Sequence, residues 1–381
     1  MRKVVVMGVG ATIAGKLPDK GIEALGREAV DAAVKDMGVN PKELQIGYCA
    51  NLFAGMIPGQ RIFRDAGIAD IEIVNVENAC AGGATAFRSL YQGIAAGLYD
   101  IGIAVGVESM TTSPIAGKLI PPADDDLEGQ MGMVMPAYFA LSARRHMEEY
   151  GTTAEQFAKI SVKNHHHGCL NPYSQYKKEM TVEEILGSRM ICDPITLFEC
   201  CPNTDGAAAA ILCSEDIAKK YDNEPIYVRA SALKMGDYQF KLKDLSFSDL
   251  THKVAQEAYE MAGCGPEDID VCELHDAFAS AELLHYEELG FCGRGEGGRL
   301  IDEGITELGG KIAVNASGGL LSKGHPLSAT GVAQMVEITW QLRGQAGDRQ
   351  ALNAKVGMTH TMGGTAAGIE AGACSIHILS T

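Results

Sequence analysis

The segment Val76-Glu77-Asn78-Ala79-Cys80-Ala81-Gly82-Gly83 follows a β-branched run, Ile73-Val74-Asn75-Val76. Behind it, apolar residues recur with the spacing of one buried helix face: Phe87, Leu90, Tyr91, Ile94, Ala95 and Leu98. Cys80 is therefore predicted at a strand-to-helix junction, where unpaired backbone N–H groups and the helix dipole favour a thiolate. Small residues on either side leave room for a substrate to reach the sulfur. The segment thus predicts an enzyme with a cysteine nucleophile.

Length and composition indicate a large soluble protein. With 381 residues the chain suits two fused domains or one layered unit, and it contains no apolar run of the roughly 18–20 residues that span a membrane. The net charge of −17 argues against nucleic-acid binding, because such a partner needs a basic surface. The first residues have the pattern of a strand rather than of a secretion signal, so the 11 cysteines are expected to be reduced thiols in the cytoplasm.

A weak internal repeat indicates two related halves. Pro41 turns the chain from a predicted helix into a predicted strand, and Pro266 does the same. An Ala-Thr pair follows Cys80 at positions +4 and +5 and follows His325 at the same offsets, in both cases before a helix. If the halves are duplicates, Cys80 and His325 lie at equivalent helix N-termini and face each other across a pseudo-twofold axis.

Each half alternates helices and strands and ends in an apolar strand, which predicts an α/β fold with largely buried sheets. The regular periodicity fails over residues 111–194, which are predicted to form an inserted, partly helical loop domain that covers a substrate. The predicted domains are an N-terminal half at 1–110 and 195–224, the loop domain at 111–194, and a C-terminal half at 225–381.

Four further segments place polar side chains at the ends of predicted elements: 273–278, 315–319, 324–326 and 359–364. An isolated histidine is usually structural, but histidines beside glycine or proline at element ends tend to converge on a cleft. We therefore expect His275 and His325 to take part in the chemistry, as proton carriers or hydrogen-bond donors. For His360 a structural and a functional role are equally supported.

Three other patterns have simpler explanations. Gly8-Val9-Gly10 imitates the beginning of a dinucleotide-binding loop, but the third glycine of that motif is replaced by Ile13. The histidines at 165–167 point in different directions on a helix, so a solvated face or loop is favoured over a metal site. For Cys200-Cys201, a packing role is favoured over a redox role.

Taken together, these motifs resemble those of the thiolase family along essentially the whole chain. Residues 78–83 are similar to its nucleophile loop, residues 106–110 to its following strand-end motif, and residues 324–326 to its histidine loop. The segment His275-Asp276-Ala277-Phe278 and residues 171–176 are similar to the sterol-carrier-protein-type and archaeal-type branches. Ordinary thiolases have Asn-Glu-Ala-Phe at the former place.

The resemblance implies a five-layer α-β-α-β-α core with two pseudo-twofold-related halves, at least a dimer, and coenzyme A thioesters as substrates. Cys80 would take the acyl group as a thioester, His325 would be its base, and His275 would help to stabilise the enolate. A 3-oxoacyl-CoA would be cleaved by coenzyme A, or the reverse Claisen condensation would run, without a permanent cofactor or a metal ion. A second oxyanion site is expected from the backbone N–H groups of Cys80 and of the Gly363 region. The expected substrate-binding residues are Asn315, Gly319, His360 and Gly363.

The chain departs from the family in lacking an evident second acid/base cysteine. Residues 360–363 read His-Thr-Met-Gly where a Cys-x-Gly loop is usual, and Ala277 stands where sterol-carrier-type members often have cysteine. The resulting Cys-His-His set resembles the archaeal-type branch, whose members often work with a small zinc-ribbon and oligonucleotide-binding-fold protein, so such a partner is expected. The departure leaves open a ketosynthase-like or aldolase-like enzyme on the same fold, and a non-catalytic scaffold subunit that binds acyl-CoA.

Overall fold

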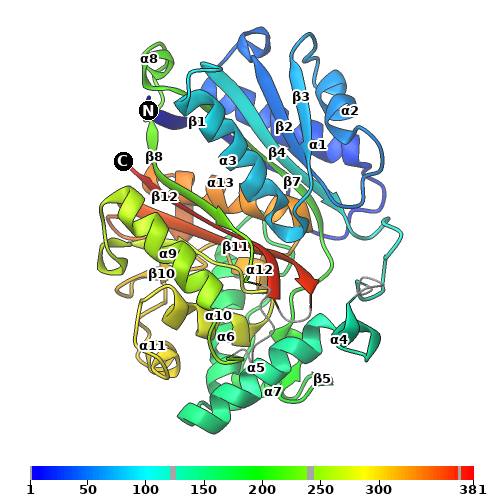
Figure 1. Cartoon of the computed structure of the whole chain (residues 1–381), viewed down its shortest axis with the longest axis vertical. Helices are drawn as coiled ribbons and strands as arrows, with labels where there is room; N and C mark the ends of the chain where they lie inside the picture. Colours follow the sequence, from blue (N-terminus) through cyan, green and yellow to red (C-terminus); the bar gives the residue numbers. More distant parts are fainter. Residues whose placement is uncertain (1, 121–125, 238–243, 368–369) are drawn as a thin grey trace.

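Two five-stranded sheets with the same strand order form the centre of the molecule (Figure 1). The computed structural model describes residues 2–120, 126–237, 244–367 and 370–381. From the centre outward, the first sheet contains β1 (Val4–Ala11), β7 (Asp205–Ser214), β4 (Ile101–Ser109), β2 (Ile46–Ala50) and β3 (Glu72–Val76). The second contains, in the equivalent order, β8 (Ile226–Lys234), β12 (Glu370–Ser380), β11 (Val356–Ala367), β9 (Val271–Glu273) and β10 (Ala313–Val314). β1 and β8 pair antiparallel at Val5 and Val6, which joins the two sheets.

The strand directions repeat as well as the order. β7 is antiparallel to both β1 and β4, and β12 is antiparallel to both β8 and β11. The outer strands of each half are parallel to their neighbours. The turns predicted at Pro41 and Pro266 also correspond, because α1 (Ile22–Met37) leads into β2 just as α9 (Asp249–Ala262) leads into β9. The predicted pair of duplicated α/β halves is confirmed.

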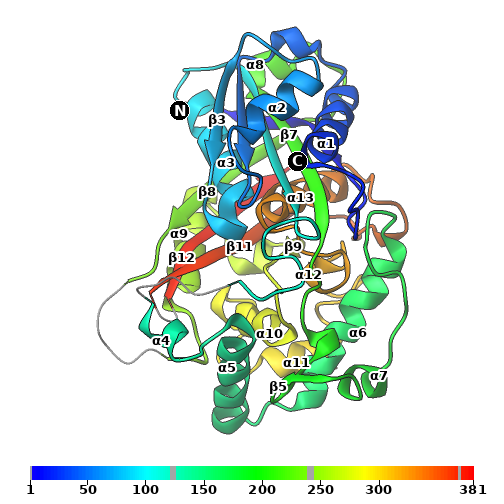
Figure 2. The same ribbon diagram turned by 90° about the vertical axis from the view of Figure 1, so that its right-hand side faces the viewer.

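Alternate residues of the strands face two different cores, which explains why the strands are apolar throughout. Val4 and Val6 of β1 face a central core, whereas Val5 and Met7 pack in an outer core with α1. The central core holds α3 (Gly82–Ala95) and α13 (Thr330–Leu342) between the sheets (Figures 1 and 2). α1 and α2 (Pro58–Asp65) cover the outer face of the first sheet, and α9 covers that of the second. This is the predicted α-β-α-β-α layering.

The N-termini of the two central helices meet at small residues. A β-carbon at Gly83 would lie 2.5 Å from the carbonyl oxygen of Ser328 and 3.0 Å from the backbone nitrogen of Val332, so only glycine permits this approach. A 3₁₀ turn precedes each helix, at Ala79–Ala81 and at Leu327–Ala329. Cys80 lies in the first turn and His325 just before the second. By the two turns Cys80 corresponds to Ser328, so the predicted equivalence of Cys80 and His325 is wrong by three residues, although both lie at the N-termini of the two central helices.

The segment between β4 and β7 is built mainly from helices: α4 (Leu127–Gln130), α5 (Met135–Tyr150), α6 (Ala154–Leu170), α7 (Val182–Leu186), and the short strands β5 (Met190–Cys192) and β6 (Ile195–Thr196). It lies at the lower end of the molecule in Figure 1. The remaining short helices are α8 (Glu215–Ala218), α10 (Ala279–Glu288), α11 (Gly297–Asp302) and α12 (Gly319–Ser322). α6 packs against α10 and α12 of the C-terminal half. Residues 121–125 of the predicted loop domain lie outside the described residues.

Two local predictions need correction or explanation. α3 ends at Ala95 and Leu98 is 73% exposed, so the predicted apolar face is wrong at its last position. The reason is Gly97, whose φ of 82° turns the chain out of the helix.

Gly8 and Gly10 allow β1 to approach α1 closely, because a β-carbon at Gly8 would lie 2.5 Å from the carbonyl oxygen of Ala33. In the part of the chain that is described, no helix has the length and hydrophobicity needed to cross a membrane.

Candidate active site

The structure brings together the three residues that the sequence singles out as catalytic. The sulfur of Cys80 and ring nitrogens of His275 and His325 all lie within 4.8 Å of one another. The two imidazole rings meet edge to face, with centroids 5.1 Å apart and an interplanar angle of 81°. Cys80 is partly exposed, whereas each histidine is only 5% exposed. A substrate can therefore reach the sulfur while the histidines stay largely shielded from water.

The loop that carries Cys80 is held in a strained conformation. Ala79 has a φ of 47°, a left-handed conformation that residues other than glycine adopt at a cost. Its backbone N–H donates to Glu77 Oε1 at 2.6 Å, and the Asn78 side-chain amide donates to Thr85 Oγ1 at 2.9 Å. On the other side the loop packs against β11, where a β-carbon at Gly363 would lie 2.7 Å from the backbone nitrogen of Ala81. These contacts fix the direction of the Cys80 side chain.

The electrostatics at Cys80 contradict the predicted thiolate. Burial, together with the nearby Glu108 carboxylate, raises the pKa of Cys80 to about 12. The backbone N–H groups of Gly364 and of Cys80 itself act in the opposite direction, but they do not outweigh the loss of solvation. Glu108 is fully buried at the end of β4 and accepts the backbone N–H of Leu52 at 2.9 Å. Cys80 is thus a neutral thiol at rest and needs a base beside it.

His325 is held in one tautomer. Its Nδ1 lies 2.8 Å from Thr330 Oγ1, and the Thr330 hydroxyl donates to the carbonyl oxygen of Pro326 at 3.2 Å. Since the hydroxyl proton is used there, Thr330 accepts the Nδ1 proton and Nε2 is left with its lone pair. Burial and the nearby Lys323 lower the pKa of His325 to about 3, so the ring is neutral. A neutral imidazole with a free Nε2 is the form that can accept a proton.

The loop that carries His275 is positioned by buried polar contacts. Asn315 Oδ1 accepts the backbone N–H of Leu274 at 2.9 Å, and the Asp276 carboxylate accepts the N–H of Leu320 at 2.7 Å. Gly319 has a φ of 59°, and a β-carbon there would overlap the Asp276 carboxylate. Asn315 and Gly319 are both buried, and they contact the segment that carries His275. Burial, together with the neighbouring imidazoles of His325 and His285, holds the pKa of His275 well below its usual range.

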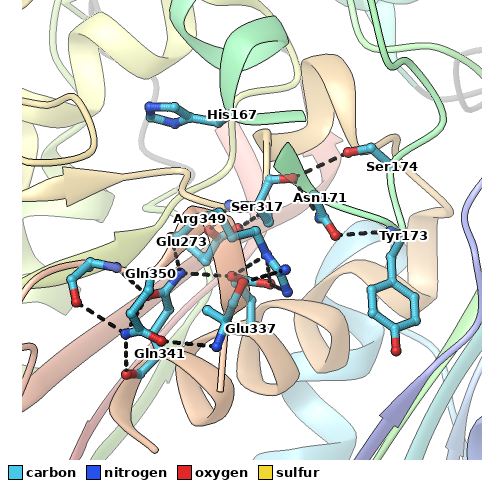
Figure 3. A network of polar contacts seen from close by, with 12 residues as sticks. His167, Asn171, Tyr173, Ser174, Glu273, Ser317, Glu337, Gln341, Arg349 and Gln350 are labelled. Carbon is cyan, nitrogen blue, oxygen red and sulfur yellow. Dashed lines mark hydrogen bonds and ion pairs between the residues drawn. The ribbon is translucent and has the colours of Figure 1, made fainter. Parts of the chain in front are cut away.

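A second set of buried hydrogen bonds holds the segment around Ser317, which follows β10, in place. Figure 3 shows Asn171 and Ser174, from the segment that follows α6, directed at Ser317. Asn171 Nδ2 donates to the Ser317 carbonyl at 2.8 Å, and the Ser317 backbone N–H donates to Glu273 Oε1 at 2.9 Å. Burial and the carboxylate of Glu337, which pairs with Arg349 at 2.9 Å, raise the pKa of Glu273 to about 7. The inserted helices thus take part in holding the strand end that precedes His275.

His360 lies away from the three-residue cluster, fully buried against His285. The ring centroids are 4.5 Å apart at 68°, and neither ring nitrogen of His360 has a hydrogen-bond partner among the described residues. His285 Nδ1 lies 2.6 Å from Glu288 Oε2, and this contact directs Nε2 of His285 away from the Glu288 carboxylate. The structure therefore places His360 in the interior, where burial and the neighbouring His285 and His275 hold its pKa well below the usual range.

The histidine run at 165–167 does not form a solvated face. His165 is 2% and His167 is 1% exposed, and only His166 reaches the surface. His167 lies 3.0 Å from the Asn315 carbonyl through Nδ1 and accepts the Leu308 backbone N–H at 3.3 Å through Nε2. The predicted solvated face is wrong because α6 is covered on two sides, by the C-terminal half and by the rest of the insertion.

Sequence reasoning missed two residues near the nucleophile. Glu108 belongs to the strand-end motif at 106–110, but the sequence did not indicate that its carboxylate would help to raise the pKa of Cys80. Cys201, like all 11 cysteines, is a free thiol, and its backbone N–H donates to the Ala277 carbonyl at 3.0 Å. Burial raises its pKa well above the usual range, with contributions from Cys200 and Cys80. This places Cys201 beside the reacting centre, a proximity that only the folded chain creates.

Comparison with known proteins gives the family. Residues 4–216 match the family described as Thiolase, N-terminal domain, and residues 236–376 match Thiolase C-terminal domain-like. The acetyl-CoA acetyltransferase of Methanothermobacter thermautotrophicus is 43% identical over 100% of both chains, and the benzoylsuccinyl-CoA thiolase subunit BbsB of Thauera aromatica is 40% identical over 95% of both. Sterol carrier protein 2 of Bos taurus is 41% identical over 95% of this chain and 70% of its own.

A solved structure leads to the same conclusion. The protein titled Ltp2-ChsH2(DUF35) aldolase superimposes with a TM-score of 0.86 at 25% identity, covering 100% of this chain and 98% of that one. Its strand and helix arrangement extends over both halves and the insertion. With both family domains matched and several relatives above 40% identity, the chain belongs to the thiolase family of acyltransferase enzymes.

Proposed function

We propose that this enzyme is an acyl-CoA C-acyltransferase that cleaves a 3-oxoacyl-CoA with coenzyme A, or runs the reverse condensation, through an acyl-Cys80 thioester. The observation that carries the proposal is the cluster of Cys80, His275 and His325, with His325 held as a neutral base by Thr330. The relatives named acetyl-CoA acetyltransferase and benzoylsuccinyl-CoA thiolase support coenzyme A thioesters as the substrate class.

In the first half-reaction, His325 Nε2 takes the proton of the Cys80 thiol as the sulfur attacks the 3-oxo carbon. The bond between carbons 2 and 3 breaks, and the acyl group stays on Cys80. The leaving acetyl-CoA enolate takes a proton from the His325 imidazolium. The raised pKa of Cys80 requires this coupling, because hardly any thiolate exists before the base acts.

In the second half-reaction, the thiol of coenzyme A gives its proton to His325 and attacks the thioester carbonyl. The bond between the acyl carbon and Cys80 breaks, and the departing thiolate recovers the proton from His325. The backbone N–H groups of Gly364 and Cys80, which face the sulfur, are suited to stabilise the oxyanion of this step. Losing one such donor typically costs about 10²–10³ in rate.

His275 is proposed to bind the thioester oxygen of the departing enolate. Its ring lies against His325 and its Nδ1 has no partner among the described residues, so the ring is not committed to a structural hydrogen bond. We infer that Asn315, Gly319 and Asp276 act through His275 by positioning its loop. Gly363 and Gly364 act through the close packing of β11 on the nucleophile loop.

The presence of Cys80 favours acyl transfer over the aldolase alternative. A retro-aldol cleavage needs no acylatable thiol, whereas here a partly exposed thiol lies within reach of two neutral histidines. The same geometry argues against a pure scaffold subunit, because a strained nucleophile loop has no use in passive binding.

We further propose that the enzyme works in the cytoplasm as a homodimer or larger assembly, with a small zinc-ribbon and oligonucleotide-binding-fold subunit. Two of the similar proteins support a second protein, because BbsB is named as a subunit and the Ltp2-ChsH2(DUF35) aldolase carries two component names. Co-expression of the chain with a small subunit encoded beside it, followed by size-exclusion chromatography with light scattering, tests this. Elution of the two chains in separate peaks would contradict it.

The test of the function is a turnover assay with 3-oxoacyl-CoA substrates of increasing chain length and with aromatic acyl groups. Coenzyme A is added, and the acyl-CoA products are separated by chromatography. Two shorter thioesters should form from at least one substrate, and Cys80→Ser should abolish them. Cys169→Ser, which alters a thiol on α6, is the matched control and should keep wild-type turnover.

A further inference from the structure

The catalytic cluster has a second chemical property, which is that of a metal-ligand set. Among the described residues, Cys80, His275 and His325 are the one group of three or more Cys, His, Asp or Glu side chains whose ligand atoms lie within 4.8 Å of one another. We propose that these three side chains bind one Zn²⁺ ion and that the ion inhibits the enzyme by occupying the place of the reacting thioester. The proposal uses the residues of the proposed function but does not require that acyl transfer occurs.

The donor atoms match zinc. Thiolate sulfur and imidazole nitrogen are the ligands that Zn²⁺ takes in protein sites with three protein ligands and one open position. His325 commits Nδ1 to Thr330, and His275 Nδ1 has no hydrogen-bond partner among the described residues, so each ring has a nitrogen available to a metal ion. Carboxylate-selective ions such as Mg²⁺ find no oxygen ligand in this set.

The distances are close to those of a tetrahedral site. Bonds of about 2.3 Å to sulfur and about 2.0–2.1 Å to nitrogen place tetrahedral ligands about 3.3–3.6 Å apart. The three atoms, which lie within 4.8 Å of one another, need to approach by about 1 Å or a little more. A small joint movement of the sulfur and the two imidazole rings, each about its own side-chain bonds, supplies that adjustment. The partial exposure of Cys80 also gives the ion a path to the site.

The surroundings of His325 have the form of an outer ligand shell. Metal-bound histidines almost always donate their other ring N–H to an oxygen, which fixes the nitrogen that meets the metal. Thr330 Oγ1 does this for His325 at 2.8 Å. Glu108, which disfavours the Cys80 thiolate in the free enzyme, favours a positive ion at the same place.

Binding releases one proton, since the Cys80 thiol becomes a zinc-bound thiolate and its proton passes to solvent. The thiolate is then no longer free to attack a carbonyl carbon, and His325 no longer has a lone pair for the proton. The fourth position on the ion is open to water or to the thiolate of coenzyme A. Inhibition should therefore be complete and reversible by a chelator.

The experiment begins with enzyme treated with EDTA and then freed of it. Zn²⁺ is titrated in competition with a chromophoric chelator, and Co²⁺ is added separately as a spectroscopic substitute. We expect one ion per chain, a thiolate-to-cobalt charge-transfer band in the near ultraviolet, and a visible spectrum of tetrahedral intensity. Zinc should also prevent alkylation of Cys80 by iodoacetamide, as read by peptide mass spectrometry.

Variants identify the ligands. Cys80→Ser and His325→Ala should each weaken zinc binding at least about 100-fold, beyond the roughly 10–100-fold that loss of an outer partner costs. Cys169→Ser is the matched control, because Cys169 lies near Glu179, which His166 contacts at 2.8 Å, and it could bind metal at the surface instead. Wild-type affinity in the control is expected.

The proposal is overturned if no ion binds, if cobalt shows no charge-transfer band in the wild-type enzyme, or if Cys80→Ser binds zinc as tightly as the wild type. The cobalt spectrum needs no variant and so does not depend on how well the variants fold. If metal-free enzyme forms no acyl-enzyme but binds zinc through Cys80, the proposed function fails and the metal site stands. If acylation occurs and zinc does not bind, the reverse is true.

Discussion

His325 Nδ1 lies 2.8 Å from Thr330 Oγ1, and Thr330 is the first residue of α13, directly after the 3₁₀ turn that follows His325. Thr85 performs the corresponding task on the other side, since it accepts a hydrogen bond from Asn78 in the nucleophile loop at 2.9 Å. The duplicated fold therefore uses one threonine in each half to fix the turn that carries a reacting residue.

The first prediction follows from this contact. Thr330→Val keeps the shape of the side chain but removes the acceptor for Nδ1–H, so His325 is free to adopt the wrong tautomer. We expect kcat to fall roughly 10-fold or more, as part of the roughly 10²–10⁴-fold that a positioned base supplies. The matched control is Thr339→Val on the same helix, where a buried hydroxyl donates only to the Met335 carbonyl at 2.8 Å.

Thr330→Val should lose more stability than Thr339→Val, because the Thr330 hydroxyl makes two buried hydrogen bonds and that of Thr339 makes one, each contributing about 1 kcal/mol. Only Thr330→Val should lose turnover. Equal kcat values for the two variants, measured at one pH with saturating substrate, would show that the hydroxyl of Thr330 has no role beyond folding.

The second prediction concerns the reactivity of Cys80. Because burial and Glu108 raise its pKa to about 12, alkylation of Cys80 by iodoacetamide should be slow at pH 7 and should rise about tenfold per pH unit up to pH 9. Glu108→Gln removes one cause and should speed alkylation at fixed pH. Glu77→Gln is the control, since exposed Glu77 makes the smallest contribution. A rate that levels off below pH 8 would show that Cys80 is already a thiolate there, as the sequence suggests, and would contradict the raised pKa.

The third prediction concerns stability against pH. The pKa of Glu273 is about 7 in the folded protein, above its unfolded value, so folding favours the protonated form. Its stabilising contribution is complete below about pH 4.5 and is lost as the pH rises through 7, and it is on the order of 3 kcal/mol. Glu273→Gln, which preserves an acceptor for Ser317, should remove this fall.

The measurement is urea unfolding of both proteins between pH 6 and 8. The buried histidines with lowered pKa values still titrate at about pH 6.5 in the unfolded chain, so they raise the stability of both proteins alike as the pH rises. The stability of the wild type relative to that of Glu273→Gln should therefore fall across this range. Parallel curves for the two proteins would mean that Glu273 is ionised at pH 6 already.

The fourth prediction tests the support of His275. Gly319→Ala places a methyl group against the Asp276 carboxylate at a positive φ and should destabilise the fold by more than the roughly 1 kcal/mol of the backbone alone. Gly344→Ala is the matched control, because Gly344 has a φ of 68° and open space around it. If the unfolding temperature falls equally in both variants, the close approach of Asp276 is not the reason why glycine is needed at position 319.

The repeat was enough to predict the topology, because the turns at Pro41 and Pro266 depend on local chemistry that survives in sequence. The Ala-Thr pairs located Cys80 and His325 at the N-termini of the two central helices, but the register that they suggested is wrong by three residues. Burial was harder to foresee. Nothing near Leu98 announces that Gly97 ends the helix, and nothing near His165 shows which elements cover α6.

Charge was the least predictable property of the site. A cysteine at a helix N-terminus suggests a thiolate, but the pKa of Cys80 is raised first by burial and then by Glu108, which folding brings close from a different strand. Asn315 and Gly319 are similar cases. Their glycine-rich segment suggested contact with a substrate, whereas the structure places them where they hold the loop of His275.

The central claim is that Cys80 becomes covalently acylated. Intact-protein mass spectrometry after mixing metal-free enzyme with acetyl-CoA, and separately with longer and aromatic acyl-CoA thioesters, tests it most directly. The account predicts a mass gain of one acyl group with at least one thioester, absent in Cys80→Ser and present in Cys169→Ser. No adduct with any thioester, from enzyme that is folded and assembled with its partner, would contradict it.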